Sequence, residues 1–397
     1  MSISCRVRTL VSDSETDTLS SGVIVVGQLV TGTSEQIFGT DTLKHLASAL
    51  ASMQAARYYG EDDLRLESVP KPTIGPGEVL VNLQAASICG SDINYLTGKT
   101  DPATEPVTLG HEGAGIVEAV GPGVETVTQD DRVVIHYVQS CGGCRPCNEG
   151  NDNRCRHRNS IGHHVDGTFA EYIAVPERAV LPLPDEVSFG EGSITGCAVS
   201  TGYHAVHVAD VRPGDCVVVF GAGGVGLHAI LWASRLGAGT TVAVDLDDRQ
   251  LEAAAEYGAD VLVNPDTDDV TDRVLEVTDG WGANASIECS GSPQAMAQAI
   301  DVLTGQTHYE SGTAVSVGIQ TEPMSVEYTD IREGQLRVSG DHNRAELGEI
   351  LRLLSRGAVD VSPTITHEVP LEDIHAGVET VMARDEQVGR VIVDLTG

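Results

Sequence analysis

The chain has 397 residues, of which 58 are Asp or Glu and 24 are Lys or Arg, so its formal net charge is −34. This length exceeds that of one ordinary domain, usually about 100–200 residues, and predicts two domains. The negative charge repels nucleic acid phosphates and anionic membranes, and no stretch has the roughly 18 apolar residues of a membrane span, which argues against both partners.

Arginine provides most of the positive charge, since Lys44, Lys71 and Lys99 are the only lysines, while acidic residues occur along the whole sequence. At about 1 M salt the Debye length falls to about 3 Å, so repulsion among such carboxylates is screened. This composition predicts a halophilic protein. The apolar run at 22–30 lacks a signal-peptide layout, so we expect a cytoplasmic protein, in which disulfides are disfavoured.

The first segment, residues 1–52, is rich in Ser and Thr and has no sustained helix or strand period. We expect it to be either a leader of doubtful order or the product of a miscalled start, with translation beginning at Met53.

Short alternating apolar runs, separated by Gly and Pro, extend from Met53 to about Cys197. They predict an antiparallel, partly barrel-like β domain. The runs are GEVLVNLQAA (77–86), GAGIVEAVG (113–121), DRVVIHY (131–137) and FAEYIAVP (169–176).

From residue 198 to 341, continuous apolar strands alternate with helical patterns, which indicates βαβ units and a parallel sheet. The strands are CVVVF (216–220), TTVAVDLD (240–247), DVLVNP (260–265), ASIE (285–288) and TAVSV (313–317). The helices are GLHAILWASRLG (226–237), DRQLEAAAEYGA (248–259) and SPQAMAQAIDVLTG (292–305). A helix at 346–359 and a strand at 389–397 return to the first domain, which therefore comprises 53–197 and 342–397.

The motif GAGGVG (221–226) follows an apolar strand and opens a helix, with Asp245 at the end of the next strand. Gly221 permits the tight turn, Gly223 lets a pyrophosphate approach the backbone, and Gly226 allows close helix packing. Asp245 can bind a ribose diol and would repel a 2′-phosphate. A simple Gly-rich turn is the alternative, but the context favours a dinucleotide site with NAD preferred over NADP.

Four cysteines lie in one loop, 141–155, at the spacing C-x2-C-x2-C-x7-C. Disulfides conflict with a reducing cytosol, and an iron–sulfur cluster lacks the Cys-Pro end of the bacterial ferredoxin run. A tetrahedral structural zinc needs only four thiolates on a tight turn. We therefore expect zinc at Cys141, Cys144, Cys147 and Cys155. A nucleic-acid-binding zinc knuckle is disfavoured, because the Arg residues of this loop are expected to pair with carboxylates.

Cys89 in CGSD, His111 in GHE and Cys197 in GCAVSTGY form a second set of metal-ligand types. Two cysteines and one histidine are the ligands of the catalytic zinc in alcohol dehydrogenase, where a fourth position stays open. Taken singly, each residue could equally be a core thiol or a turn histidine. Their occurrence beside a dinucleotide motif favours a catalytic zinc site.

Together these motifs resemble the zinc-dependent alcohol dehydrogenases of the medium-chain dehydrogenase/reductase family. The resemblance covers the chain from Met53 onward and rests on CGSD, GHEGAGIVEAVGPGV (110–124), the four-cysteine loop, GCAVSTGY and GAGGVG, in the family's order and intervals. It implies an α/β protein with a GroES-like catalytic domain and a Rossmann domain of doubly wound parallel sheet at 198–341. It also implies an active site in the cleft between the domains, and a homodimer or homotetramer.

For the catalytic centre, the resemblance implies zinc ligation by the second set and a nearby acid, Glu112, that can approach the metal. Asp92 corresponds to the carboxylate that orients the liganding histidine, as such outer partners do. Ser91 corresponds to the hydroxyl that takes the proton of a small-molecule alcohol. One catalytic and one structural zinc per subunit would then support hydride transfer between this alcohol and the nicotinamide.

For the cofactor and substrate, Thr201 and Val225 correspond to side chains that pack on the nicotinamide ring. Arg390 corresponds to a pyrophosphate contact, and Tyr137 to an aromatic wall of the substrate pocket. Two positions depart from the family pattern. Asn94 replaces a common relay histidine and cannot titrate, and Gly90 replaces a phosphate-binding arginine.

Two other functions compete with this prediction. Polyol, sugar or threonine dehydrogenases of the same family commonly have Glu-Pro where this chain has Gly196-Cys197, so the sequence favours simple alcohols and aldehydes. A non-catalytic relative would be expected to lack metal ligands, and none is missing here.

Overall fold

A computed structural model describes residues 52–303, 312–325, 335–383 and 389–396. The expected leader lies outside the described residues except for Ser52, with which the first strand begins. Every site residue considered below belongs to one compact unit, Gln54–Glu67 and Pro72–Gly397. Among the described residues, none of the helices combines the length and apolar character needed to cross a bilayer.

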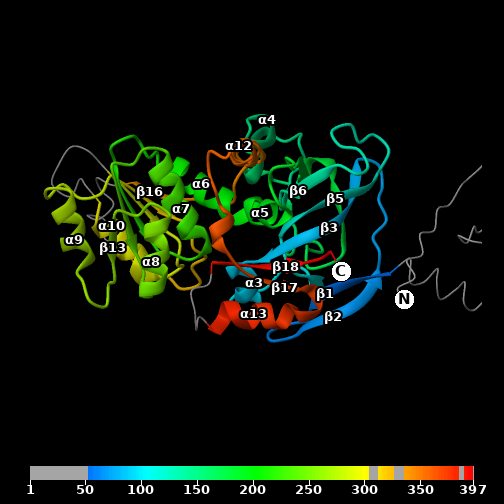
Figure 1. Ribbon diagram of the computed structural model, residues 1–397, viewed down its shortest axis with the longest axis horizontal. Coiled ribbons are helices and arrows are strands. Elements are labelled where there is room, and N and C mark those ends of the chain that lie inside the picture. Colours follow the sequence, from blue (N-terminus) through cyan, green and yellow to red (C-terminus); the bar gives the residue numbers. More distant parts are fainter. Residues whose placement is uncertain (1–51, 304–311, 326–334, 384–388, 397) are drawn as a thin grey trace, which may run out of the picture. The chain divides into compact units, whose positions relative to one another are not determined.

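The strands and helices carry the labels of Figure 1. The strands are β1 (Ser52–Tyr58), β2 (Leu64–Pro70), β3 (Glu78–Ile88), β4 (Val107–Thr108), β5 (Glu112–Val120), β6 (Arg132–Ile135), β7 (Val138–Gln139), β8 (Asn159–Ser160), β9 (Tyr172–Pro176), β10 (Val180–Pro182), β11 (Cys216–Phe220), β12 (Thr240–Val244), β13 (Val261–Val263), β14 (Ala285–Glu288), β15 (Thr313–Ser316), β16 (Gln335–Val338), β17 (Ile365–Pro370) and β18 (Arg390–Asp394). The α-helices are α3 (Gly90–Leu96), α4 (Arg145–Asn148), α5 (Phe189–Ile194), α6 (Ser200–Val208), α7 (Gly224–Arg235), α8 (Asp248–Glu256), α9 (Val270–Val277), α10 (Pro293–Asp301), α12 (Arg344–Ser355) and α13 (Ile374–Ala383). Short turns of other helix types are η1 (Asp152–Arg154), η2 (Glu177–Ala179), η3 (Thr195–Val199), η4 (Ser362–Thr364) and η5 (Leu371–Asp373).

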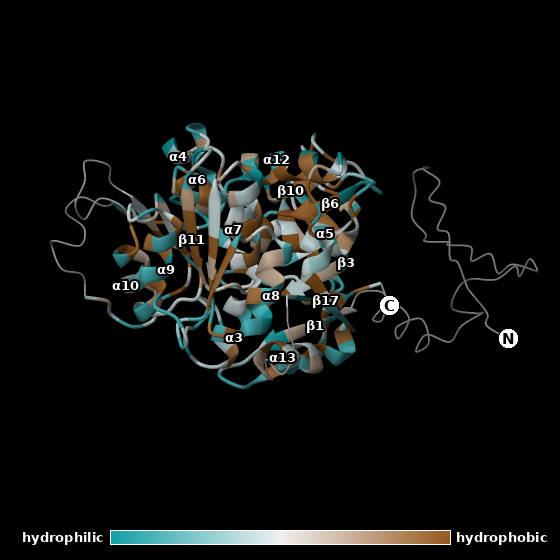
Figure 2. Cartoon of the chain, turned by 60° about the vertical axis from the view of Figure 1, so that its left-hand side comes forward, coloured by the Kyte–Doolittle hydropathy of each residue, from teal (hydrophilic) through white to brown (hydrophobic). Residues whose placement is uncertain are grey.

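Six parallel strands form one sheet in the order β13-β12-β11-β14-β15-β16. The central strand β11 is buried along its whole length, as the run CVVVF predicts, and Figure 2 shows hydrophobic colouring on the strands around it. Because side chains alternate across a strand, Val217 and Val219 join the core that contains α7 and α8 residues. Val218 and Phe220 join the opposite core, which contains residues of α9 and α10. Helices therefore cover both faces, as in a doubly wound sheet.

A second, mixed sheet of seven strands has the order β10-β6-β5-β3-β18-β17, with β9 also paired to β3. Its longest contact is the antiparallel pair β3 and β5, and the loops at the ends of these two strands carry Cys89 and His111. The last described strand, β18, pairs antiparallel with β3 and parallel with β17. The C-terminal segment therefore lies in the same sheet as the two strands that adjoin Cys89 and His111.

Each strand and helix that we expect from periodicity within the described residues is present, with ends that differ by a few residues. The expectation gave no range for several other elements, which are α3, α5, α6, α9, α13, β1, β2, β16, β17 and the shortest strands and turns. Many of these are short or contain Gly.

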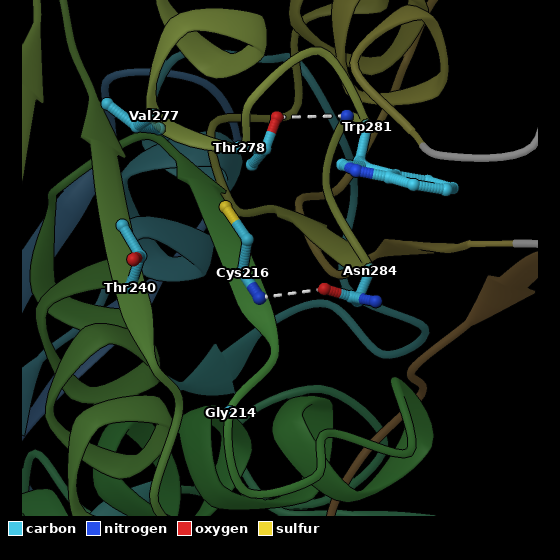
Figure 3. A pocket seen from close by; sticks show the side chains of 8 residues that line it. Gly214, Cys216, Thr240, Val277, Thr278, Trp281 and Asn284 are labelled. Carbon is cyan, nitrogen blue, oxygen red and sulfur yellow. Dashed lines mark hydrogen bonds between the residues drawn. The ribbon is translucent and has the colours of Figure 1, made fainter.

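A hollow of about 270 Å³ lies at the amino ends of strands β11, β12 and β14 (Figure 3). Cys216 and Thr240 begin their strands here, and Trp281 is 60% exposed beside them. Ligands of open parallel sheets bind at the carboxyl ends of the strands. This hollow is thus at the edge opposite Gly221 and Asp245.

His228 is fully buried on α7, with Nδ1 2.6 Å from the Gly224 carbonyl oxygen and Nε2 3.4 Å from Thr364 Oγ1. Burial lowers the pKa of His228 to about 3. The unfolded imidazole binds a proton below about pH 6.5, whereas the folded one stays neutral down to about pH 3. Within this window the folded state therefore loses stability as the pH falls, by about 1.4 kcal/mol per pH unit.

We expect His228→Gln to remove this part of the acid sensitivity. Between pH 7 and pH 5 at constant salt, wild-type protein should lose about 2 kcal/mol more unfolding free energy than the variant, as measured by urea denaturation. The matched control is His375→Gln, at an exposed position of α13, which should behave as wild type. Equal losses in wild type and His228→Gln would contradict the assignment.

Candidate active site

The turn before β5 places His111 by a backbone conformation that requires glycine. Gly110 has φ +85°, in the left-handed region, and a Cβ there would lie 2.6 Å from the Phe169 ring. Glu112 follows as the first residue of β5 and is fully buried. The sequence Gly-His-Glu thus turns the chain and points two chemically active side chains inward.

Cys89 is placed by the end of β3 and the start of α3. Its backbone N–H donates to Asp92 Oδ2 at 2.9 Å, and the other Asp92 oxygen accepts from Gly110 N at 3.3 Å. That same oxygen lies 3.7 Å from His111 Nδ1. Asp92 therefore fixes both loops, and its place beside the imidazole agrees with the orienting position that the sequence implies.

Cys197 lies in η3, a single π-helical turn between α5 and α6. Such turns are rare and frequently mark functional sites. A Cβ at Gly196 would lie 2.7 Å from the Ile135 carbonyl oxygen, so only glycine allows the turn to approach β6 this closely. The Gly-Cys pair therefore brings the second thiol toward the first.

These elements bring Cys89, His111, Glu112 and Cys197 together. One ligand atom from each lies within 4.8 Å of the others, and all four residues are buried. Two sulfurs and an imidazole nitrogen are zinc ligands of ordinary type, and Oε2 of Glu112 has no hydrogen-bond partner. The donor set fits a zinc ion with room for one further ligand.

Each titratable group in this cluster changes the pKa of its neighbours. The hydrogen bond from Cys197 holds the pKa of Cys89 well below that of a free thiol, and the same contact, with burial, raises the pKa of Cys197. Burial alone would lower the pKa of His111, but the charges of Asp92 and Cys89 raise it well above 6.5. A metal ion binds the deprotonated forms, so its arrival would release the protons held here.

Arg390 forms a buried ion pair with Glu112. Burial raises the pKa of Glu112 to about 8, against the opposing effect of the Arg390 charge. Arg390 also reaches the cofactor loop, because a Cβ at Gly224 would lie 3.0 Å from its side chain. The residue expected at the pyrophosphate thus contacts both the cluster and the first turn of α7.

The remaining residues expected to act on substrate or cofactor lie in α3, α6, α7 and the turn between β6 and β7. Thr201 Oγ1 lies 3.9 Å from Cys197 Sγ, and Ser91 is half-buried in the first turn of α3. The Tyr137 ring stands edge-on to His111 with centroids 5.3 Å apart. Val225 is half-buried in the first turn of α7.

The glycine loop is built as its spacing predicts. Gly221 has φ +86°, and a Cβ at Gly226 would lie 1.7 Å from the Gly221 carbonyl oxygen. Gly223, the first residue before α7, has open space where its Cβ would stand. Asp245 Oδ2 accepts from Ala222 N at 2.7 Å, which ties the acid to the loop. These residues fit a dinucleotide pyrophosphate at a helix N-terminus.

The four-cysteine lobe, which we define as residues 141–158, contains a second compact set. Its sulfurs lie within 4.8 Å of one another, with Cys144 at 3.5 Å from Cys147 and 3.8 Å from Cys155. Disulfide sulfurs are about 2.05 Å apart, which excludes disulfides here. Tetrahedral zinc with bonds of about 2.3 Å spaces its sulfurs by about 3.8 Å. Two of the four arginines of this lobe pair with carboxylates as expected: Arg145 with Glu149 and Arg158 with Asp341.

The amino-acid sequence is similar to those of known proteins. Residues 75–185 match the family model described as alcohol dehydrogenase GroES-like domain, and residues 224–356 match the model described as zinc-binding dehydrogenase. An alcohol dehydrogenase of Geobacillus stearothermophilus is 34% identical over 334 residues, covering 83% of this chain and 96% of the relative. The chain belongs to the zinc-dependent alcohol dehydrogenases of the medium-chain dehydrogenase/reductase family.

Further relatives fix the fold and the reaction class of this dehydrogenase. A sorbitol dehydrogenase of Bacillus subtilis is 30% identical over 350 residues, covering 86% of this chain and 97% of the relative. The solved alcohol dehydrogenase from Thermus sp. ATN1 has a TM-score of 0.79 at 28% identity, covering 86% of this chain and 99% of that one. The predicted α/β fold with GroES-like and Rossmann parts is confirmed. The reaction is hydride transfer between an alcohol and a nicotinamide cofactor, and both the simple-alcohol and the polyol alternatives fit.

Sequence reasoning missed Asp341 and His342 at this dehydrogenase's site. Tyr137 Oη donates to Asp341 Oδ1 at 2.6 Å across 204 positions of sequence, and the His342 ring lies 5.4 Å from the Tyr137 ring. The local sequence GDHN reads as an ordinary turn, so only the fold reveals these contacts.

Proposed function

We propose that the protein is a zinc-dependent alcohol dehydrogenase in which Cys89, His111 and Cys197 hold the catalytic zinc. The observation that carries this proposal is the buried approach of three ligand side chains, which come from the residue after β3, the residue before β5 and the turn η3. Structural thiols rarely gather with an imidazole and a carboxylate in this way. Glu112 remains the acid that can approach the metal.

When bound, zinc would act as a Lewis acid on the alcohol oxygen and the nicotinamide would accept the hydride. The protein residues provide the rest. Ser91 Oγ accepts the hydroxyl proton while its own proton passes on to solvent, so the O–H bond of the alcohol breaks. The C–H bond breaks as its hydrogen leaves as the hydride, and a carbonyl results. Asp92 holds the two ligand loops at a fixed separation through its bonds to Cys89 N and Gly110 N. Thr201 and Val225 pack on the nicotinamide and orient its reactive face.

A structural zinc in the four-cysteine lobe is part of the same proposal. Backbone N–H groups of Cys141 and His157 lie 3.3 and 3.4 Å from Cys155 Sγ, as suits a metal-bound thiolate. Hydrogen bonds from the backbone of Cys147 and Arg156 lower the pKa of Cys144 to about 6. With four thiolates, such a site has no position for substrate, so its role is to fix the lobe.

The cofactor is NAD rather than NADP. Gly221, Gly223 and Gly226 form the pyrophosphate turn, and Arg390 supplies a charge beside it. Asp245 is held at the loop by Ala222 N and Asp247 N, where its carboxylate suits a ribose diol and repels a 2′-phosphate.

The substrate is a simple alcohol, or its aldehyde or ketone in the reverse direction. This choice follows from the Gly196-Cys197 pair, whose close approach to Ile135 leaves no room for a larger residue at 196. The alternative is a polyol, sugar or threonine dehydrogenase of the same family, while a non-catalytic relative is disfavoured by the complete ligand set.

We also propose a cytoplasmic, salt-adapted homodimer or homotetramer, with a GroES-like domain of 53–197 and 342–397 and a Rossmann domain of 198–341. The charge of −34 supports salt adaptation. For assembly, the edge strand β16 presents Leu336 and Val338, which are 42% and 69% exposed. An exposed apolar edge of this kind favours pairing with another chain.

Cys89→Ala should abolish turnover while sparing cofactor binding. Losing a metal that supplies several kcal/mol of charge stabilisation lowers kcat by at least about 10³-fold. Bound zinc, measured by mass spectrometry, should fall from two ions to one. Cys216→Ala, which changes a buried thiol in neither metal cluster, is the control. Two retained zinc ions with near-normal turnover would refute the ligand assignment.

Gly223→Ala and Gly226→Ala form a matched pair. The second should cost roughly 1–3 kcal/mol of unfolding free energy, because its Cβ would overlap the Gly221 carbonyl oxygen. The first meets no protein atom within 4 Å, so it should fold normally yet weaken NAD binding about tenfold or more by blocking the pyrophosphate. Urea denaturation measures the unfolding free energy, and a fluorescence titration measures the NAD affinity. Wild-type NAD affinity in Gly223→Ala would place the cofactor elsewhere.

A substrate panel of ethanol, a butanediol, sorbitol and threonine, with NAD and NADP, tests substrate and cofactor preference in molar salt. We expect the highest kcat/KM for ethanol with NAD, and loss of activity in salt-free buffer as screening disappears. A clear lead for sorbitol or threonine would favour the alternative. Preference for NADP would contradict the role of Asp245, and full activity without salt would contradict salt adaptation.

A further inference from the structure

Asp341 occupies an unusual place between β16 and α12. Its φ is +55°, in the left-handed region, where non-glycine residues are uncommon. The other described non-glycine residues with positive φ, Asp62, Asp130, Asp210 and Asp279, are exposed, whereas Asp341 is partly buried. Its carboxylate is also engaged on both oxygens.

One oxygen of Asp341 holds Tyr137. Tyr137 Oη donates to Asp341 Oδ1 at 2.6 Å, and the Tyr137 ring stands edge-on to His111, 5.3 Å between centroids at 72°. The same ring also contacts the His342 ring, at 5.4 Å between centroids and 70°. Tyr137 is thus held by one hydrogen bond and two ring contacts.

The other oxygen of Asp341 reaches the four-cysteine lobe. Arg158 forms an ion pair with Asp341 Oδ2 and donates to Asn153 O at 2.6 Å. Asn153 in turn donates through Nδ2 to the Asp341 carbonyl oxygen at 2.9 Å. Asp152 of the same lobe accepts from Arg344 N at 3.1 Å. Backbone and side chain of Asp341 are thus both fixed by the lobe.

Helix capping does not account for these contacts. The residue that caps α12 is Asn343, whose Oδ1 accepts from Glu346 N at 3.0 Å. In the reciprocal bond, Asn343 N donates to Glu346 Oε2. A contribution to the free energy of unfolding does not explain the Asp341 contacts either. The Arg158 and Asp341 side chains are 39% and 22% exposed, and partly exposed ion pairs contribute little, least of all in high salt.

We propose that Asp341 is a positioning residue, which fixes Tyr137 against the metal-ligating His111 and links the four-cysteine lobe to the wall of the substrate site. This inference rests on the proposed function for the roles of His111 and Tyr137. Without the Asp341 carboxylate, the partly buried Tyr137 hydroxyl loses its charged acceptor, and its ring can leave the edge-on position. The lobe then has a role beyond holding its own loop.

Asp341→Asn, Tyr137→Phe and Arg158→Gln test the proposal. Asn tolerates the same backbone conformation, so Asp341→Asn should fold while losing the charge that binds Arg158 and strengthens the tyrosine bond. We expect it to raise the KM for the alcohol about tenfold with kcat changed less than about twofold, since the hydrogen bond from Tyr137 to a charged group becomes a weaker one to a neutral amide. In the double variant with Tyr137→Phe, the increase should be no larger than in either single variant. The control is Asp130→Asn, which changes an exposed aspartate of similar φ.

A second measurement does not depend on turnover. Zinc release from the four-cysteine lobe to a chromogenic chelator should be at least about threefold faster in Asp341→Asn and Arg158→Gln than in wild type and Asp130→Asn. Additive effects of Asp341→Asn and Tyr137→Phe on KM, or an unchanged KM in Asp341→Asn, would overturn the link to the substrate wall. Unchanged zinc release would overturn the link to the lobe. Absence of turnover in wild type would instead refute the proposed function, and the zinc measurement would still decide whether Asp341 is coupled to the lobe.

Discussion

The burial of two thiols, an imidazole and a carboxylate within 4.8 Å is the constraint on which the remaining structure depends. A buried charge without a partner costs several kcal/mol, whereas a whole domain is stable by only about 5–15 kcal/mol. The fold therefore surrounds the cluster with compensating groups: Asp92 beside His111, and Arg390 beside Glu112. Each partner comes from a different element, so the cluster exists only when β3, β5, η3 and β18 are in register.

Arg390 shows how this constraint serves two sites. Its guanidinium pairs with Glu112, while its side chain lies against Gly224 in the first turn of α7. A bulky residue at 224 would displace Arg390 and leave Glu112 as an uncompensated buried acid. The glycine loop and the metal-type cluster are thus parts of one electrostatic arrangement, although Glu112 and Gly221 are more than 100 positions apart in the sequence.

Much of this could be predicted from the sequence, because its information is local. The apolar run at 216–220 predicts a buried strand, and the glycine and cysteine spacings predict compact turns, as observed. Helix α13 was not predicted, since Gly377 lowers helix propensity. That glycine lets the helix pack closely on β3, since a Cβ there would lie 2.8 Å from Ile88 Cδ1. The pairing of Tyr137 with Asp341 was likewise beyond prediction, since no local pattern specifies a contact between distant loops.

The two cysteine clusters differ in a way that separates their chemistry. In the lobe, Cys141 is exposed, and the four thiols contact one another and backbone N–H groups, so four equivalent ligands would enclose a metal ion. In the interior cluster the thiols are buried and share their surroundings with an imidazole and an acid that has an unpartnered oxygen. Low dielectric strengthens every charge interaction there. A metal ion would therefore have a structural role in the four-cysteine lobe and a catalytic role in the interior cluster. Asp341 contacts both the lobe, through Arg158, and the Tyr137 ring beside His111.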